Sequence, residues 1–370
     1  MRHIYLFYLL LSLSVVSGCV DQTNIEDISL SLMIGIDLDD NNNLVVSSSS
    51  PVFNKEAKQM EENNVVQAFS LRQSREQFDS MITALTSRGK VQVVLIGKRI
   101  VEHPGWFNLL DTFFRDGKNT TKSRVVLVDG SVADLIKFAP ADKPRLPLYL
   151  LKLIDTAHKQ NITVKTSLQE LHREFNEKGM SPCITVLKKD GQIKITGTAL
   201  LDRSGKYIMT LDANETKLLR ILQHENHGTF PFTIRLPEQP NKGFFEENTM
   251  SFFPNILKTK TKVAFKDNGF IFDVQIKMGV VITERLFLYD AKNKTPELEK
   301  QIQEELQTQI EQLLDKIQGA KIDPIGLGLY ARAYEYSDWK KVAESWDEAF
   351  SNAKVNVKVK VRIRAHGSTS

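Results

Sequence analysis

The residue with the clearest chemical role is Cys19, and the three residues before it indicate that role. The chain reads Val16-Ser17-Gly18-Cys19, a branched apolar residue and two small residues directly before a cysteine. Small side chains give a peptidase access to the bond before Cys19, and the order matches a bacterial lipobox. The Cys19 thiol is then the nucleophile that takes up a diacylglycerol, and the freed amine takes an acyl chain. The alternative is an ordinary signal peptide followed by a chance cysteine.

The first 18 residues have the pattern of the export signal that this cleavage requires. Arg2 and the free amine form a positive start, and the apolar run from Ile4 to Val16 is broken only by Ser12 and Ser14. As a helix, about 13 residues cover about 20 Å, short of a hydrocarbon core of roughly 30 Å. We therefore predict a lipoprotein signal peptide over residues 1–18. Two or three acyl chains, at about 0.8 kcal/mol per buried CH₂, anchor a protein stably where one chain is marginal.

Composition limits the other roles that the chain could have. Removing residues 1–18 removes one basic residue, Arg2, and leaves 48 basic and 45 acidic residues. That balance does not favour nucleic acid, which needs a concentrated basic face. With Cys19 acylated, Cys183 is the one remaining cysteine, so no intrachain disulfide forms and the fold depends on its own core.

The remaining reactive side chains do not form a recognisable catalytic or metal-binding pattern. His224-Glu225-Asn226-His227 is not His-Glu-x-x-His and has no third ligand placed by spacing, so a surface helix end is the better interpretation. Cys183 has no histidine nearby in sequence, and we expect a buried thiol. Nucleophile-elbow, phosphate-loop and dinucleotide motifs are missing from the sequence. We expect no enzyme activity, no cofactor and no metal.

A calcium loop is the other candidate that the sequence offers. Asp37, Asp39 and Asn41 occupy positions 1, 3 and 5 of such a loop, but position 6 is Asn42, and position 12 is Ser48 instead of glutamate. We therefore interpret 37–43 as a hairpin turn between two strands.

The elements that position these residues follow from apolar periodicity. In the first part, strands and helices alternate, which is typical of an α/β layer. We expect strands at 29–37, 44–46, 91–96 and 124–128, a polar loop at 47–62, and helices at 78–88, 106–114 and 131–138. After prolines at 140, 144 and 147, helices at 148–158 and 167–178 indicate a middle lobe. Capping boxes at Ser167/Glu170 and Asp212/Glu215 mark two helix starts.

The last part of the chain predicts long strands and a long helix. Strands are expected at 184–188, 193–201, 207–211, 230–236, 250–265 and 270–289, with a hairpin signal at Asn268-Gly269. Thr295-Pro296 predicts the start of a long helix with an apolar stripe from Ile302 to Ile317, and two further helical stretches, 325–334 and 339–350, follow. Trp339 and Trp346 lie seven residues apart, and we expect them to share a core-facing side.

The final strand has the clearest period in the sequence. Val355 to Ile363 alternates apolar residues with polar ones, so that Lys358, Lys360, Arg362 and Arg364 share one face. Those cations could meet anionic lipid head groups. The alternative, which we favour from the sequence, is a solvated face whose lysines protect a sheet edge.

Taken in order, several short motifs resemble the Ger(x)C family of spore germination lipoproteins, the C subunits of germinant receptors in endospore-forming bacteria. The resemblance covers essentially the whole chain, although Val20 stands where the family often has tryptophan and Lys98 where an acidic residue is common. The motifs are Gly18-Cys19-Val20-Asp21, Ile34-Gly35-Ile36-Asp37, Val93-Val94-Leu95-Ile96-Gly97, Phe113-Phe114-Arg115-Asp116, Gly197-Thr198-Ala199-Leu200 and Asp323-Pro324-Ile325-Gly326-Leu327-Gly328, with Trp339 and Trp346.

The resemblance implies an α+β fold of three mixed α/β domains, with largely antiparallel sheets in the C-terminal domain. We expect an N-terminal α/β domain at 19–139, a small middle lobe at 140–192 that is helical with a strand, and a C-terminal α+β domain at 193–370. It also implies a non-catalytic protein that is lipid-anchored through Cys19 outside the inner spore membrane and assembles with two integral-membrane receptor subunits. A solute-binding lipoprotein of a transporter is the main alternative and predicts two doubly wound lobes around a cleft. An anchored hydrolase is the third interpretation.

Overall fold

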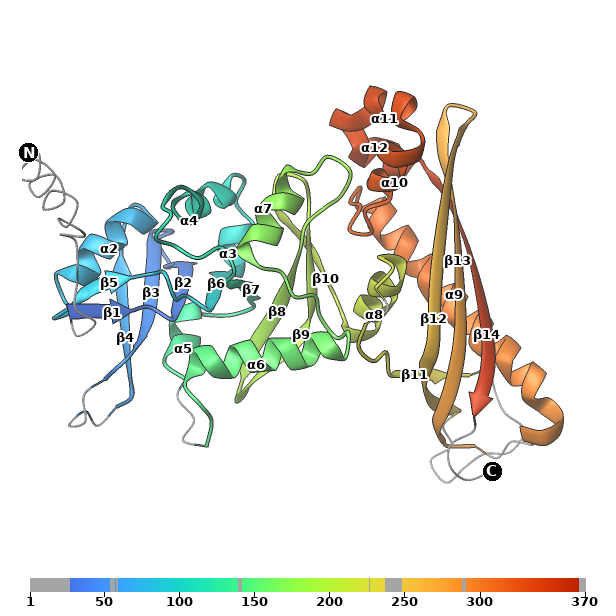
Figure 1. Cartoon of the computed structure of the whole chain (residues 1–370), viewed down its shortest axis with the longest axis horizontal. Coiled ribbons are helices and arrows are strands. Elements are labelled where there is room, and N and C mark those ends of the chain that lie inside the picture. Colours follow the sequence, from blue (N-terminus) through green and yellow to red (C-terminus); the bar gives the residue numbers. More distant parts are fainter. Residues whose placement is uncertain are drawn as a thin grey trace, which may run out of the picture.

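Two large sheets and the helices that cover them make up most of the part of the molecule that the structure describes (Figure 1). The computed structural model describes residues 27–53, 57, 59–138, 142–225, 227–236, 248–287 and 291–365, and of residues 291–293 the backbone only. A small third sheet pairs β1 (Ile28–Leu30) with β5 (Leu85–Ser87) in parallel. Helices and mixed sheets together confirm the predicted α+β class.

The larger sheet has eight strands in the order β10-β9-β8-β7-β6-β2-β3-β4. Its centre, from β2 through β6 and β7 to β8, is parallel, whereas both sides end in antiparallel pairs. The strands are β2 (Met33–Leu38), β3 (Leu44–Pro51), β4 (Glu61–Gln67), β6 (Val93–Gly97), β7 (Arg124–Val128), β8 (Cys183–Asp190), β9 (Gln192–Leu201) and β10 (Tyr207–Leu211).

Helices cover both faces of this sheet, because the central strands carry apolar residues on both sides. One core cluster lies under α2 (Leu71–Asp79), α3 (Lys98–Val101), η2 (Trp106–Leu110), α4 (Asp111–Arg115) and α7 (Leu168–Asn176). The other lies under α5 (Val132–Ile136) and α6 (Leu146–Lys159).

The C-terminal sheet has four strands, β11 (Phe232–Arg235), β12 (Thr249–Lys266), β13 (Gly269–Arg285) and β14 (Lys354–Ala365). Its first two pairings are antiparallel and the last, β13 with β14, is parallel, which agrees with the predicted largely antiparallel character. The helices of this part are α8 (Ala213–Leu222), α9 (Ala291–Gly319), α10 (Leu327–Tyr334), α11 (Tyr336–Val342), η3 (Ala343–Ser345) and α12 (Trp346–Ser351).

One continuous core cluster joins this part to the larger sheet. The apolar stripe of α9 from Ile302 to Ile317, which the sequence predicted, is buried in this cluster together with the inward-facing side chains of β13. Helix α8 contributes Leu218 and Leu222 to the same cluster, which also reaches Leu200 of β9. Figure 1 shows α8 between the two sheets and α9 lying diagonally along the four-stranded one.

Both predicted capping boxes are present. The hydroxyl of Ser167 accepts from Glu170 N–H while the Glu170 carboxylate accepts from Ser167 N–H, and Asp212 and Glu215 do the same at α8. The β12–β13 hairpin is also confirmed, one residue earlier than its sequence signal. Its two turn residues are Asp267 and Asn268, both with φ near +55° (51° and 60°), and Gly269 pairs with Lys266.

Three predicted elements are wrong. Residues 47–51 and 61–67 are strands β3 and β4, and Ser47–Ser50 are buried, so the polar loop is confined to the connection between them. In place of the helix predicted at 78–88, α2 ends at Asp79 with Phe78 near its end, and Leu85 belongs to β5. Helix α9 begins at Ala291, and Pro296 lies inside it.

The predicted domain boundaries cross hydrogen-bonded elements. Strands β8 and β9 lie on either side of the expected boundary between 192 and 193, yet they are antiparallel neighbours in one sheet. Strand β8 also pairs with β7, which belongs to the expected N-terminal domain. The larger sheet therefore continues through the expected middle lobe, because the apolar run of β8 is buried by insertion beside β7.

A buried carboxylate fastens the C-terminal part to the segment before β8. Asp323 Oδ1 accepts from Gly326 N–H at 2.8 Å, and Oδ2 accepts from Gly328 N–H and Trp346 Nε1–H, both at 2.9 Å. Ser181 N–H donates to the Asp323 carbonyl at 2.8 Å, and Asp323 N–H donates to Ser181 Oγ at 3.0 Å. Burial raises the pKa of Asp323 to about 6, although its three N–H donors favour the charged form.

Within the part of the chain that the structure describes, no helix is long and apolar enough to cross a membrane.

Candidate functional site

Cys19, the predicted lipidation site, lies outside the described residues, as does the whole predicted signal peptide. Its modification therefore stays a prediction from the sequence.

His224 and His227 each make structural contacts and are not arranged to bind one metal ion together. His224 follows the C-cap of α8 with a positive φ of 63°, hydrogen-bonds Thr261 Oγ1 through Nε2 at 2.9 Å, and stacks on Tyr330. Burial lowers the pKa of His224. The carbonyl of His227 accepts from Asn161 Nδ2 at 3.1 Å, and its side chain is exposed. Among the described residues, no three acidic, histidine or cysteine side chains cluster as a metal site would require.

Cys183 is buried, as predicted. Its Sγ–H points to the Ser181 carbonyl at 3.8 Å, and burial raises the pKa of the thiol well above its usual value. A protonated, buried thiol is a poor nucleophile. Trp339 and Trp346 are both buried, and the latter packs edge-on against Phe270, so the expected core-facing side is confirmed.

Residues 37–43 form the predicted hairpin turn. Asp39 Oδ1 accepts from the N–H groups of Asn41 and Asn43 at 2.9 and 2.8 Å, whereas Asp37 Oδ2 accepts from Val132 N–H at the start of α5. The carboxylates of Asp37 and Asp39 therefore accept hydrogen bonds from different backbone segments and do not face a common site. Hydrogen bonds from Asn43 lower the pKa of Asp39.

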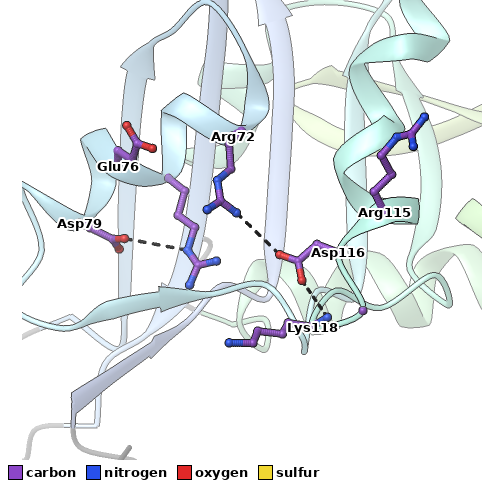
Figure 2. Close-up of a pocket in the computed structure, with 8 residues that line it drawn as sticks. Arg72, Glu76, Asp79, Arg115, Asp116 and Lys118 are labelled. Atoms are coloured by element: carbon purple, nitrogen blue, oxygen red, sulfur yellow. Dashed lines mark hydrogen bonds and ion pairs between the residues drawn. The ribbon is translucent and has the colours of Figure 1, made fainter. Parts of the chain in front are cut away.

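The structure also shows a charged groove that the sequence did not indicate, between α2 and the turn after α4 (Figure 2). Its volume is about 630 Å³. We call it the α2–α4 groove, and its lining residues are Arg72, Arg75, Glu76, Asp79, Arg115, Asp116, Gly117 and Lys118. Four of these are cations and three are carboxylates.

The α2 side of the groove is the polar face of that helix. Ser70 caps α2 by accepting from Gln73 N–H, and Leu71, Ser74 and Phe78 are buried beneath. The charged residues at i, i+3, i+4 and i+7 therefore share the opposite face, and they are Arg72, Arg75, Glu76 and Asp79. That pattern is present in the sequence, but the predicted helix began too late to include it.

Ion pairs hold most of these side chains. Arg72 lies 4.0 Å from Asp116, Arg75 lies 3.9 Å from Asp79, and Arg115 Nε contacts both Asp111 oxygens at 2.7 and 2.8 Å. Figure 2 shows Asp116 facing Arg72 across the groove and accepting from Lys118 N–H. The groove offers paired charges of both signs, without a nucleophile and base in contact, and suits recognition of a charged partner better than catalysis.

Arg88 supports the groove from below. Its Nη1 donates to the Leu71 carbonyl at 2.8 Å and its Nη2 to Ser74 Oγ at 2.9 Å, which fixes the first turn of α2. Burial is the largest cause that lowers the pKa of Arg88 to about 10, so the guanidinium stays charged at neutral pH.

Comparisons with known proteins match both halves of this fold. A family described as "Spore germination protein N-terminal domain" matches residues 21–189, and one described as "Spore germination B3/ GerAC like, C-terminal" matches residues 196–367. The chain belongs to the Ger(x)C family of spore germination proteins.

Individual members of the Ger(x)C family are distant relatives of this chain. Spore germination protein A3 of Bacillus subtilis (strain 168) is 23% identical in a 381-residue alignment that covers 96% of this chain and 95% of the relative. Spore germination protein YndF of the same organism is 24% identical over 284 residues, which span 75% of this chain and 68% of the relative. The solved structure of the GerBC protein has a TM-score of 0.58 at 18% identity and covers 90% of this chain, so it shares the fold.

Proposed function

We propose that this Ger(x)C protein is the lipid-anchored, non-catalytic C-type subunit of a membrane germinant receptor needed for nutrient-triggered spore germination. Cys19 carries the S-diacylglycerol and the N-acyl chain. The body lies on the outer face of the bacterial cell membrane and, in the spore, of the inner spore membrane. Its partners are two integral-membrane receptor subunits, one A-type and one B-type, and it binds no nucleic acid.

The observation that carries this proposal is the agreement between the lipobox and the family match. Val16-Ser17-Gly18-Cys19 is directly followed by a segment, from residue 21, that matches the N-terminal family domain. Confinement to a membrane surface raises the effective concentration of the body beside a membrane partner. The anchor thus contributes to assembly without any added contact.

Two features support a binding role over a catalytic one. Cys183 is buried and protonated, and His224 is held by Thr261 and Tyr330, so neither is arranged as a nucleophile or general base. The α2–α4 groove has exposed, paired charges that fit a protein surface of matching polarity.

The rival solute-binding function predicted two doubly wound lobes around a hinge cleft. The described residues instead form an eight-stranded mixed sheet with antiparallel ends and a four-stranded sheet, joined by the core cluster that includes α8. No observation favours the transporter component, and we do not propose it.

Co-purification from detergent-solubilised spore membranes tests the proposed function. We expect two polytopic membrane proteins to be recovered with the tagged chain, and the Cys19→Ala variant to be lost from the membrane fraction. Recovery of a transporter permease in their place, or a Cys19→Ala variant that remains fully membrane-bound with its partners, would contradict it. Equilibrium dialysis against amino acids and sugars gives a second readout, since a solute binder holds its ligand unaided.

A further inference from the structure

The outward face of the β12–β14 sheet carries a dense positive charge. Helix α9 covers the other face, and the side chains that alternate outward on residues 256–266, 271–281 and 354–364 are opposite it. We call this surface the basic sheet face. It has one carboxylate, Asp273, and ten exposed cations, which are Lys258, Lys260, Lys262, Lys266, Lys277, Lys354, Lys358, Lys360, Arg362 and Arg364.

Strand register places like charges directly opposite one another. Lys258 pairs with Lys277, and Lys277 pairs with Lys360, so that three lysines form one row across three adjacent strands. Directly opposed side chains in a sheet have Cβ atoms about 5 Å apart, and like charges at that spacing destabilise the sheet. The next row places Lys260 and Lys358 on either side of Gln275.

The protein itself neutralises little of this charge. Asp273 accepts from Asn356 Nδ2 at 2.9 Å, and Arg362 pairs with Glu299 of α9 at 3.0 Å. Among the described residues, the other nine cations have no carboxylate within 4.0 Å. The repulsion within the face is therefore uncompensated in the isolated chain.

Protection of a sheet edge accounts for only part of this pattern, because it leaves the lysine of the central strand unexplained. Strand β14 is an edge strand, so its lysines fit that role, as the sequence suggested. Strand β12 pairs with β11 only at Thr249–Phe252, so its lysines also lie along an open edge, whereas β13 is paired on both sides and Lys277 protects no edge. Lys277 completes the row of three lysines and adds like-charge repulsion without protecting an edge.

Apolar side chains extend the basic sheet face at one end. Phe253 pairs with Val281 and Ile256 pairs with Gly279, on the same side as the lysines. Phe253 is 36% exposed and Ile256 is 41% exposed. Cations beside exposed apolar groups are the composition of surfaces that lie in the head-group region of a membrane.

We propose that the basic sheet face contacts an anionic phospholipid bilayer and forms a second membrane attachment, distant from Cys19. This inference rests on the proposed lipid anchor, which keeps the body beside the bilayer. Asp27 is eight residues along the chain from Cys19, a reach of at most about 29 Å. Figure 1 shows β1 and the four-stranded sheet at opposite ends of the long axis, so attachment at both ends lays the molecule along the membrane.

A planar anionic surface fits the face better than an acidic protein does. The cations spread in two dimensions over three strands, and repulsion is relieved wherever phosphate groups come between them. Each lysine near an anionic bilayer contributes roughly a fivefold factor to the binding equilibrium. Raising the salt to about 1 M shortens the screening length to about 3 Å and removes this contribution.

The test uses the full lipidated chain, reconstituted in vesicles, with a fluorophore on Gln275→Cys at the centre of the face. Cys183 is buried and does not compete for the label. Quenchers attached to the lipid head groups report how often the face lies on the bilayer. We expect strong quenching in phosphatidylglycerol vesicles, little in phosphatidylcholine vesicles, and loss of quenching at 1 M salt.

Two double variants complete the test. Lys277→Gln with Lys360→Gln removes a cross-strand lysine pair from the face, and we expect the ratio of bound to unbound face to fall about 25-fold. The matched control is Lys188→Gln with Lys194→Gln, a cross-strand lysine pair in the eight-stranded sheet, which leaves the ratio unchanged. Equal effects of the two double variants overturn the proposal.

The vesicle composition and the receptor subunits give further tests of membrane contact by the basic sheet face. Equal quenching in both vesicle types overturns the proposal, as does quenching that occurs only when membrane receptor subunits are co-reconstituted, which assigns the face to a protein partner. Flotation with phosphatidylcholine vesicles at 1 M salt reports the Cys19 anchor alone. Failure of the anchor is therefore seen separately from failure of the face.

Discussion

Replacing Gly328 with alanine should destabilise the protein more than any exposed helix substitution, because Gly328 lies against another part of the backbone. A Cβ at this position would be 2.5 Å from Gly179 Cα, 2.6 Å from the Gly179 carbonyl oxygen and 2.7 Å from Trp346 Cε2. Carbon atoms in contact prefer about 3.5–4.0 Å. The start of α10 must therefore move by roughly 1 Å away from the segment that contains Gly179.

The cost of that movement has two parts. Overpacking of a filled site costs about 1–3 kcal/mol. The shift also strains the two hydrogen bonds between Asp323 and Ser181, at about 1 kcal/mol each. We expect the Gly328→Ala variant to lose about 3–5 kcal/mol of unfolding free energy.

Urea unfolding followed by tryptophan fluorescence measures this loss, since Trp346 is buried directly against the substitution. The matched control is Gly319→Ala at the end of α9, where nothing lies within 4 Å of the added methyl group. We expect the control to change the free energy by less than about 1 kcal/mol. A Gly328→Ala variant as stable as the control would refute the close packing described here.

Three further substitutions test the buried groups. Asp323→Asn turns one acceptor oxygen into a donor that faces an N–H group, and urea unfolding at pH 8 should show a loss of about 1–3 kcal/mol; a gain in stability would contradict the hydrogen-bond account. Burial raises the pKa of Glu174 to about 7, against 4.5 as its ordinary value, so the folded state holds the proton more tightly. The stability that Glu174 contributes is present below pH 4.5 and is lost as the pH rises through 7, by at most about 3 kcal/mol, and Glu174→Gln should flatten the unfolding free energy over that range. Cys183 should react with a thiol reagent only as fast as the chain opens, and a Cys183→Ala chain should show no labelling; rapid labelling of the native protein would contradict a buried thiol.

Local signals in the sequence predicted the elements whose residues contact their own neighbours. The capping boxes at Ser167 and Asp212 involve residues three apart, and the α9 stripe and the alternation of β14 are periods within one element. These patterns depend on the geometry of a single helix or strand, so they can be predicted from the sequence without knowledge of the tertiary fold.

Elements that depend on tertiary partners were missed. Ser47–Ser50 read as a loop, yet β3 lies between β2 and β4, and Ser31 and Ser48 satisfy each other at 2.8 Å. Thr295-Pro296 predicts a helix start because proline favours the first turn, whereas α9 begins at Ala291. Strand pairing outweighs local propensity at β3.

The basic sheet face and the α2–α4 groove could likewise be predicted only where their residues belong to one element. The cations of β14 were visible as a period, but the lysines of β12 and β13 join them only through the register of three strands, one of which enters in parallel after α9. The α2–α4 groove needs Asp116, more than 40 residues along the chain from Arg72, to be brought beside α2. Spacing along the sequence does not encode such contacts.

Mass spectrometry of the chain isolated from spore membranes tests the central claim most directly. We predict that the mature chain begins at Cys19 and that its first residue carries a diacylglycerol on sulfur and an acyl chain on nitrogen. A mature chain that begins at another residue, or that has a free thiol at Cys19, would contradict the account of a body tethered beside its membrane partners.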